Sequence, residues 1–358
     1  GMVFRNQAVN YNEELEDKAV TDKLTYYSVR NGRMMEVPKD VHTYGGCRKV
    51  NEFEKLNRVG AGTYGVVYRA RDTKSKEIVA LKKMRREVMY RGISESILRE
   101  VTLLTELRHE NIVKMKEVAV GKDVKSIFLV MEFCEQDLTS VMQHYTDPFN
   151  ESQIKCLLQQ LLSALVFLHE HFVIHRDLKL SNLLLNGHGI LKVADFGLAR
   201  TFADGKSLMT PCVVTLWYRA PELLFGSQLQ SGAIDLWAVG CILGELILHS
   251  PLLPGQSEID QINRIIQLLG TPNVKLWPEL NDLPNIQQFT LRDQPFNNIK
   301  TKFDRSTQST MDLLNDLFIY NPQYRISARK ALKHKYFDEY PPACDPLLMP
   351  TYRQHRNE

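Results

Sequence analysis

The hydrophobic pattern of the chain changes near Cys134, and this change limits the folds that the sequence can adopt. Before it, short β-rich runs such as residues 66–70 and 78–84 alternate with glycine or Asp/Lys turns, as in an antiparallel sheet. After it, residues 154–172 and 233–248 are long apolar stretches of the kind that forms buried helices. The sequence therefore predicts a small β-rich part followed by a larger helical part.

One helix is expected inside the β-rich part, because four apolar residues recur there on a single face: Ile97, Val101, Leu104 and Leu107. Two further strand-like runs follow, at residues 112–120 and 126–132. We expect an α+β fold with two lobes, a small antiparallel β-sheet lobe with one helix and a larger, mainly α-helical lobe. The predicted divisions are an N-terminal extension, partly disordered, at 1–46, the small lobe at 47–132, the large lobe at 133–338 and a C-terminal tail at 339–358.

Composition narrows the class of protein. The formal net charge is +3, which argues against an extended nucleic-acid-binding surface and against an electrostatic membrane anchor, so neither partner is expected. The six cysteines include no C-x-x-C pair, which favours reduced thiols in a nuclear or cytoplasmic protein. No run of 18 apolar residues occurs, and the start of the chain lacks a signal-peptide pattern, so we expect a protein that is not secreted.

A glycine-rich segment opens the β-rich part. Residues 60–67, Gly-Ala-Gly-Thr-Tyr-Gly-Val-Val, match the pattern G-x-G-x-x-G-x-V. Gly60, Gly62 and Gly65 would let backbone N–H groups approach a polyphosphate with no Cβ in the way. Taken alone, the same glycines fit a tight hairpin equally well. A dinucleotide-binding turn would place a helix directly after them, whereas a strand-like run follows here.

That run ends in Val-Ala-Leu-Lys, a form of the V-A-I-K motif, with Lys82 seventeen residues after Gly65. Lys82 would hold the α- and β-phosphates of a nucleoside triphosphate, and it needs a carboxylate to position it. Glu100, on the inward face of the predicted helix, is the candidate. In isolation each would be interpreted as a solvated surface side chain, so the assignment depends on the motifs that follow.

Residues 175–182, His-Arg-Asp-Leu-Lys-Leu-Ser-Asn, match H-R-D-L-x-x-x-N, and Asp-Phe-Gly begins thirteen residues after Asn182. Phosphoryl transfer chiefly requires groups that position the reactants and neutralise charge. Asp177 would orient the acceptor hydroxyl and take its proton, and Lys179 would lie near the transferred group. Asn182 and Asp195 would hold Mg²⁺ on the phosphates of ATP. The absence of G-x-x-x-x-G-K-[ST] argues against a Walker-type ATPase.

Residues 53–337 resemble a eukaryotic protein kinase domain, and several motifs are similar to those of the cyclin-dependent kinase family. These are Ser-Glu-Ser-Ile-Leu-Arg-Glu at 94–100, Asp-Phe-Gly-Leu-Ala-Arg at 195–200, Val-Val-Thr-Leu-Trp-Tyr-Arg at 213–219, and Leu-Gly-Thr-Pro at 269–272 followed by Trp277-Pro278. The resemblance implies a Ser/Thr kinase that uses Mg·ATP, binds a cyclin and regulates the cell cycle or transcription. The missing T-x-Y in the activation segment argues against the mitogen-activated kinases.

The resemblance also implies how activity is regulated. Thr210 stands where the family carries its activating phosphothreonine, which a separate activating kinase supplies. A phosphate needs cationic partners, and Arg99, Arg176 and Arg200 stand at the three family positions that converge on it. Thr63 and Tyr64 match the family's inhibitory phosphorylation pair. Ser94 replaces the expected Pro at the entry to the cyclin-binding helix, which bears on the choice of cyclin.

For nucleotide and substrate, the resemblance assigns a larger set of residues. In the nucleotide site, the residues implied to sandwich the adenine are Val59, Val67, Ala80 and Leu184, with Met131 as the gatekeeper. The backbone groups of Glu132 and Cys134 would bond the adenine edge, and Asp137 would bind the ribose. Protein substrates with Ser/Thr-Pro sites are implied, because three residues match a shallow pocket for the proline: Val213, Val214 and Arg219. An ion pair between Arg325 and Glu222 is implied as a structural feature.

Two alternatives stay open at this stage. A pseudokinase scaffold would bind nucleotide or cyclin without turnover, although no catalytic position is degraded here. An active kinase of a related, cyclin-independent group is the other, because Ser94 and the helix signature are variants. Binding of cyclins and turnover by the isolated chain would distinguish the three.

Overall fold

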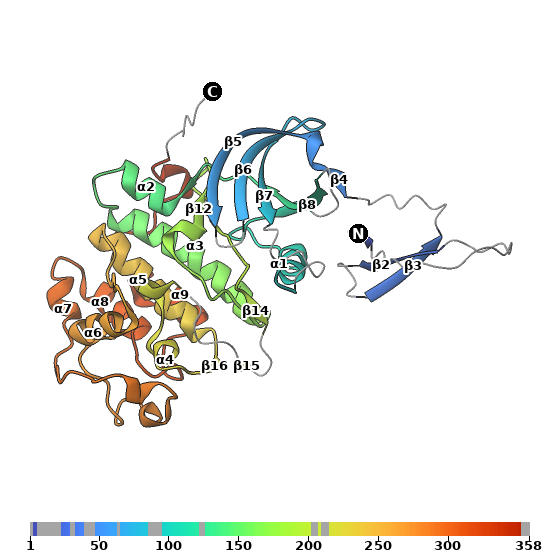
Figure 1. Ribbon diagram of the computed structural model, residues 1–358. Helices are drawn as coiled ribbons and strands as arrows, with labels where there is room; N and C mark the ends of the chain where they lie inside the picture. Colours follow the sequence, from blue (N-terminus) through green and yellow to red (C-terminus); the bar gives the residue numbers. More distant parts are fainter. Residues whose placement is uncertain are drawn as a thin grey trace. The chain divides into compact units, whose positions relative to one another are not determined.

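The computed structural model describes residues 3–5, 23–28, 33–38, 47–62, 65–84, 95–121, 126–201, 207–208 and 215–351. These residues belong to two units (Figure 1). Of the described residues, the first contains those up to Arg108 together with those of 113–133, and the second contains His109–Ile112 and those of 134–351. The boundaries that the sequence suggested for the extension and the tail stay predictions.

A six-stranded sheet in the order β4-β8-β9-β7-β6-β5 builds the first unit. Its strands are β4 (Arg48–Lys49), β5 (Phe53–Gly62), β6 (Gly65–Asp72), β7 (Ile78–Met84), β8 (Met115–Val120) and β9 (Ile127–Glu132). All neighbours are antiparallel except β4 and β8. Figure 1 shows β5, β6 and β7 side by side as a curved sheet. Its buried apolar cluster is Phe53, Ala70, Val79, Leu81, Ala119, Phe128 and Val130.

Helix α1 (Glu95–Glu106) is the helix expected in this unit. Val101 and Leu104 are buried, and so is Leu107 just beyond its end, as the apolar spacing predicted. The side chain of Ile97 lies outside the described residues. The α+β prediction for this part of the chain is therefore confirmed.

Among the residues described before residue 47 there are three strands, in a region where the sequence suggested no element. β1 (Val3–Arg5), β2 (Lys23–Ser28) and β3 (Arg33–Pro38) make an antiparallel sheet in the order β1-β2-β3. In its register, Tyr26 pairs with both Arg5 and Met35. The run Leu-Thr-Tyr-Tyr in β2 is rich in residues that favour strands, and it was the available signal.

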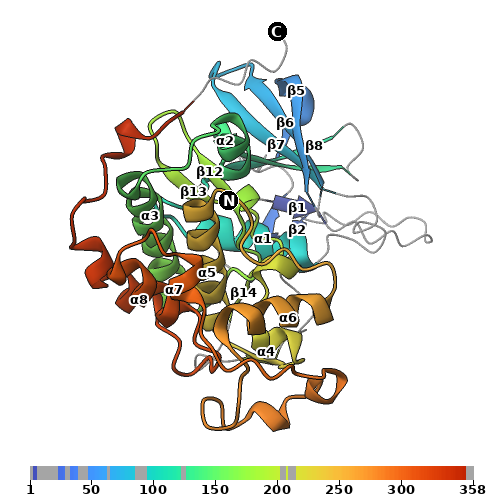
Figure 2. The ribbon, with the colours of Figure 1, turned by 90° about the vertical axis from the view of Figure 1, so that its left-hand side faces the viewer.

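The second unit is mainly helical. Its helices are α2 (Leu138–His144), α3 (Glu151–Glu170), α4 (Pro221–Leu224), α5 (Ala233–Leu248), α6 (Glu258–Leu269), α7 (Ile299–Lys302), α8 (Gln308–Leu317) and α9 (Ala328–Leu332). Helix α5 lies among the others (Figure 2) and contacts α3 and α8. It is buried almost all round, which explains its nearly continuous apolar sequence. No helix among the described residues is long and apolar enough to cross a membrane.

Short strands and 3₁₀ turns shape the loops of this unit. β10 (Gln136–Asp137), β12 (Leu183–Leu185) and β13 (Leu191–Val193) form one antiparallel sheet. β11 (Val173–Ile174) pairs with β14 (Arg200–Thr201), and β15 (Ser207–Leu208) pairs with β16 (Leu229–Gln230). The 3₁₀ turns η3 (Leu180–Asn182) and η4 (Leu216–Tyr218) lie in the loops discussed below. The other 3₁₀ turns among the described residues are η1 (Val50–Glu52), which belongs to the first unit, and η5 (Leu280–Asp282), η6 (Ile286–Gln288), η7 (Lys335–Phe337) and η8 (Pro346–Leu348).

The implied pair of Arg325 and Glu222 forms deep inside the second unit. Arg325 makes two parallel bonds, Nη1 to Oε1 at 2.7 Å and Nη2 to Oε2 at 2.8 Å. The guanidinium also lies 5.1 Å from the ring centre of Trp237. Both charges are buried, so each depends on the other to offset the loss of water.

Arg325→Ala should lower the free energy of unfolding by about 3–5 kcal/mol, because Glu222 would be left buried without its counter-ion. Urea unfolding followed by tryptophan fluorescence measures this. The matched control is Arg264→Ala, whose pair with Asp260 at 2.9 Å is exposed and screened by solvent, so its loss should change the free energy of unfolding little. Equal effects of the two substitutions would contradict the prediction.

Candidate active site

In the first unit, Lys82 and Glu100 form a buried ion pair. Lys82 Nζ lies 2.8 Å from Glu100 Oε1, and the two residues are 6% and 1% exposed. Lys82 lies on β7 between Val67 of β6 and Leu129 of β9, and Glu100 comes from α1. The pairing predicted from motif spacing is therefore present. This ion pair couples the position of the Lys82 ammonium to the position of α1.

The glycines of the β5–β6 hairpin differ in what surrounds them. A Cβ on Gly65 would lie 1.8 Å from the backbone oxygen of Lys83, so only glycine fits beside β7. A Cβ on Gly60 would meet no atom of the described residues within 4 Å. Gly62 pairs with Gly65 across the hairpin, whereas Thr63 and Tyr64 lie outside the described residues. Close packing against β7 therefore requires glycine at position 65. At Gly60 no described residue prevents a ligand from approaching the backbone.

The predicted adenine residues are divided between the two units. Ala80 on β7 pairs with Met131 on β9, and Met131 is 9% exposed. Val59 lies on β5 and Glu132 ends β9, and the carboxylate of Glu132 accepts the N–H of Lys114 at 2.6 Å. A shared adenine pocket for this set stays a prediction.

In the second unit, Leu184 of β12 pairs with Asp137 of β10, and Cys134 is buried. Asp137 caps α2 with both carboxylate oxygens. Its Oδ1 accepts the N–H of Ser140 at 2.9 Å, and its Oδ2 accepts the hydroxyl of the same residue at 2.8 Å. The side chain thus has a structural task, and its predicted contact with ribose stays a prediction.

The loop that contains Asp177 is held by a buried carboxylate. Asp235, in the first turn of α5, accepts the backbone N–H groups of His175 and Arg176, each at 3.0 Å. His169 Nε2 lies 2.8 Å from the same carboxylate. Burial opposes the ionisation of Asp235, yet the hydrogen bond and charge of His169 prevail, so the pKa of the carboxyl lies below its usual value. The anion fixes a loop in which Arg176 takes the left-handed φ of 71°.

His175 ties this loop to the Asp-Phe-Gly segment. Its Nε2 is hydrogen-bonded to the backbone oxygen of Ala194 at 2.9 Å, and its Nδ1 accepts the N–H of Asp177 at 3.1 Å. The ring also meets Phe196 edge-on, with 4.9 Å between centroids. The imidazole therefore serves as a structural link between two segments of the predicted site.

Three side chains surround the carboxylate of Asp177. Thr215 Oγ1 donates to Oδ1 at 3.2 Å, and Asn182 Nδ2 donates to Oδ2 at 3.3 Å and to the backbone oxygen of Asp177 at 2.7 Å. Lys179 Nζ lies 3.5 Å from Oδ2 and donates to Thr215 at 3.1 Å. A carboxylate held in this way can orient a hydroxyl and accept its proton.

Asn182 and Asp195 are brought near each other by a backbone hydrogen bond between Asn182 and Ala194, the residue before Asp195. The N–H of Ala194 donates to the backbone oxygen of Asn182 at 2.9 Å, and Asp195 has a left-handed φ of 61°. Their oxygens are the donor type that Mg²⁺ prefers, and such sites complete the ligand set with phosphate and water. Among the described residues, no cluster of three or more His, Cys, Asp or Glu side chains could hold a metal by itself.

The predicted regulatory and substrate-binding residues are only partly described. Thr210, Val213, Val214 and the side chain of Arg99 lie outside the described residues. Arg200 pairs with Ile174 in the β11–β14 ladder, two residues from Arg176, so two of the three arginines start from neighbouring backbone. Arg219 forms an ion pair with Glu258 at 2.7 Å. Asp235 and Thr215, in contrast, are site residues to which sequence reasoning gave no role.

Most of the chain is similar in sequence to known proteins. Residues 53–337 match the family model described as the protein kinase domain. The chain is 54% identical to cyclin-dependent kinase 10 of Mus musculus over 338 residues, 94% of either chain. Over 330 residues it is also 54% identical to cyclin-dependent kinase 10 of Homo sapiens, covering 92% of this chain and 91% of the relative. It is 50% identical to cyclin-dependent kinase 11 of Dictyostelium discoideum over 309 residues, 86% of either chain.

Asp235→Asn should destabilise the second unit by about 1.5–3 kcal/mol, because a charged acceptor of two backbone N–H groups is lost. The effect should depend on pH. A carboxylate with a lowered folded-state pKa contributes stability above its unfolded pKa of about 3.9 and loses it as the pH falls through the folded value. Urea unfolding between neutral pH and about pH 3 should therefore show the difference between wild type and variant shrinking with acid. A constant difference would contradict this assignment.

Proposed function

Because the chain belongs to the cyclin-dependent kinase family of protein kinases, we propose that a bound cyclin and phosphorylated Thr210 together activate it toward Ser/Thr-Pro sites in proteins. The enzyme is a serine/threonine protein kinase, and kinases of this fold use ATP. A separate activating kinase would phosphorylate Thr210. The enzyme would work in the nucleus, the cytoplasm or both, and regulate the cell cycle or transcription.

The array around Asp177 carries the catalytic part of the proposal. Its carboxylate is held by Thr215 and Asn182 and lies 3.5 Å from the ammonium of Lys179. A substrate hydroxyl bonded to Asp177 would be oriented toward the γ-phosphate and would lose its proton to the carboxylate. The Lys179 ammonium would then face the charge that develops on the transferred group.

Lys82 would bind the α- and β-phosphates of ATP, and Glu100 would keep its ammonium in place through the 2.8 Å contact. The oxygens of Asn182 and Asp195 would hold Mg²⁺. The metal ion, when bound, neutralises phosphate charge. The hairpin glycines would supply N–H groups to the phosphates, since no described residue crowds Gly60.

Two observations support the proposed activation. Glu100 belongs to α1, the helix whose sequence is a variant of the cyclin-binding signature, so a partner that shifts α1 would also shift the Lys82–Glu100 pair. Arg200 of β14 pairs with Ile174 of β11, and Arg176 follows Ile174 by two residues. A phosphate on Thr210 would find two cations there and would order the segment that bears it.

Asp177→Asn should lower turnover by roughly 10²–10⁴-fold, because the amide cannot take the hydroxyl proton. Binding of ATP should be retained, since the substitution is isosteric. Transfer of radiolabelled phosphate to a Ser-Pro peptide measures the first, and fluorescence of a labelled nucleotide measures the second. The exposed Asp293→Asn is the control. Near-wild-type turnover of Asp177→Asn would exclude this role for the carboxylate.

Activation is tested by measuring phosphate transfer to Ser/Thr-Pro peptides. The chain is assayed alone and together with each member of a panel of cyclins. We expect activity with one cyclin only, and about tenfold or more less activity for Thr210→Ala, because the charge-assisted bonds of the phosphate are lost.

Each other outcome of the activation test has a definite meaning. Equal rates for phosphorylated wild type and Thr210→Ala would exclude the role of Thr210. Activity without any cyclin would keep the kinase and discard the cyclin requirement. Silence with Thr210 phosphorylated and ATP bound would favour a pseudokinase scaffold.

A further inference from the structure

Three sulfur atoms lie close together where the last part of the described chain crosses α3. Cys344 Sγ donates to Met349 Sδ at 3.7 Å, and the thiol of Cys156 on α3 is hydrogen-bonded to the thiol of Cys344. These three residues form the sulfur cluster. Cys156 and Met349 are 3% and 4% exposed, whereas Cys344 is partly exposed. The cluster therefore has a buried interior and one side that solvent reaches.

Backbone contacts hold the two cysteines next to each other. The N–H of Cys344 donates to the backbone oxygen of Ser152 at 3.0 Å, and Ser152 lies one helical turn before Cys156 on α3. The buried ammonium of Lys155 donates to two backbone oxygens of the segment before Cys344, each at 2.7 Å. Since residues three and four apart share one face of a helix, this segment is fixed on the face of α3 that carries Cys156.

The 3₁₀ turn η8 brings Met349 back to Cys344. Asp345 caps the turn with its side chain, and the N–H of Met349 donates to the backbone oxygen of Pro346 at 3.0 Å. The turn also packs tightly against Gly189, where a Cβ would lie 1.7 Å from the backbone oxygen of Pro346. Backbone contacts therefore place the thioether beside the Cys344 thiol.

Gln160 is the polar neighbour of the cluster. Its Nε2 donates to Cys156 Sγ at 3.5 Å and to the backbone oxygen of Gly189 at 3.2 Å. Its Oε1 accepts from the amide of Asn111 at 3.1 Å and from the N–H of Leu191 at 2.9 Å. The amide is thus fixed at both ends. An N–H donor directed at a sulfur is the kind of partner that orients a metal ligand from outside the coordination shell.

The donor set favours a soft metal ion. Thiolate and thioether sulfurs select Cu(I) over the harder cations. With metal–sulfur bonds of about 2.3 Å, as in zinc thiolates, two sulfurs on one ion at trigonal angles lie about 4 Å apart. The 3.7 Å between Cys344 and Met349 is close to this separation. A structural zinc site would take four Cys, His or carboxylate ligands, and no group of even three lies together in the described part of the chain.

The ion would have to displace protons. Burial, and then the charge and hydrogen bond of Cys344, raise the pKa of the Cys156 thiol to about 12. The metal-free cluster therefore keeps this proton at neutral pH. A metal ion binds the thiolate form, so its binding releases protons to solvent, and only an ion with a high affinity for sulfur can do this.

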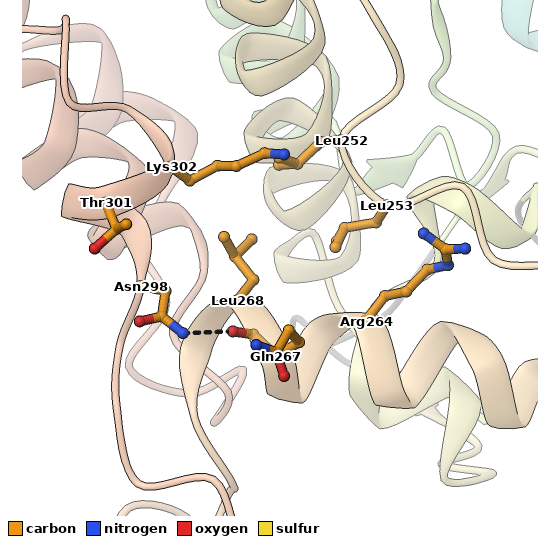
Figure 3. A pocket seen from close by; sticks show the side chains of 8 residues that line it. All are labelled: Leu252, Leu253, Arg264, Gln267, Leu268, Asn298, Thr301 and Lys302. Carbon is orange, nitrogen blue, oxygen red and sulfur yellow. Dashed lines mark hydrogen bonds between the residues drawn. The ribbon is translucent and has the colours of Figure 1, made fainter.

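The cavity between α6 and α7 has the opposite kind of lining (Figure 3). Its volume of about 530 Å³ is within the range of ligand sites. The described residues that line it are three leucines, uncharged polar side chains, and the cations Arg264 and Lys302. The amide of Asn298 donates there to the backbone oxygen of Gln267 at 2.8 Å. This lining has neither sulfur nor carboxylate and would repel a metal ion, so the donor atoms, and not the available space, favour the sulfur cluster.

We propose that Cys156, Cys344 and Met349 form a three-coordinate Cu(I) site that attaches the C-terminal segment to α3. The two cysteines bind as thiolates after losing their protons to solvent, and the thioether binds without a change in protonation. The ion enters from the partly exposed side of Cys344. This inference goes beyond the proposed kinase function and does not depend on it, because none of the three residues belongs to the array around Asp177.

The test uses the full chain, reduced and free of oxygen, with Cu(I) as the added metal. Competition with a coloured Cu(I) chelator measures stoichiometry and affinity, and X-ray absorption measures the number of sulfur ligands. Wild type should bind one Cu(I) tightly, with three sulfur ligands. Losing an outer partner of a metal ligand already costs about 10–100-fold in affinity, so the loss of a ligand in Cys344→Ser should cost at least as much.

Met349→Leu removes the thioether and keeps a buried apolar side chain of similar size. It should lower the affinity for Cu(I) by about tenfold or more and leave the fold intact. Met311→Leu makes the same change at another buried methionine, on α8, and Cys47→Ser removes a thiol of the first unit. Both controls should keep the wild-type affinity. Thermal unfolding of the metal-free chains establishes that each variant is folded.

Labelling of the wild type tests the site without any substitution. Cys344 is partly exposed and should react with iodoacetamide in the metal-free chain. Cu(I) should protect it, whereas Cys47 should react as before. Mass spectrometry of the digested chain measures both.

Equal affinity of wild type, Cys344→Ser and Met349→Leu would overturn the proposal, because other cysteines would then hold the ion. Unchanged labelling of Cys344 in the presence of Cu(I) would do the same. Full affinity of Met349→Leu alone would contradict the three-sulfur site. A disulfide between Cys156 and Cys344 that forms in place of metal binding, detected as the loss of two hydrogens, would also rule it out.

Discussion

The buried carboxylate of Asp235 is the interaction on which the predicted catalytic loop depends. It accepts two consecutive backbone N–H groups, from His175 and Arg176, and a third bond from His169. Consecutive N–H groups that point to one side require an unusual backbone, and Arg176 indeed has a left-handed φ. Asp177 is the next residue, so its position depends on the hydrogen bonds between Asp235 and the loop.

The residues that the sequence predicted best are those whose partners lie within one linear motif or at a fixed spacing between motifs. Lys82 and Glu100 were paired from such spacing, and their contact at 2.8 Å confirms it. Asp177 and Asn182 belong to one eight-residue motif and are hydrogen-bonded to each other. A resemblance that covers most of the chain added the fold, because these motifs occur together in one family.

The residues that were missed act across long sequence separations. Asp235 lies 60 residues from His175, and Glu245 lies 27 residues from Tyr218. Each acid is a single charged residue within the apolar sequence of α5, and the neighbouring residues in the sequence do not indicate what it will contact. Such an acid must find partners once the helix is buried, so its presence was a signal that something polar approaches the helix. Which group approaches follows only from the packing of the chain.

Helix α5 carries these two buried acids at opposite ends, and its backbone acts on them in opposite senses. The aligned peptide dipoles make the first turn electropositive and the last turn electronegative. Asp235 therefore bears its charge where the helix favours an anion, whereas Glu245 bears its charge where the helix opposes one. The first carboxylate is suited to be a permanent anchor. The second is bonded to a neutral hydroxyl, that of Tyr218, so one helix holds two buried acids in different electrostatic surroundings.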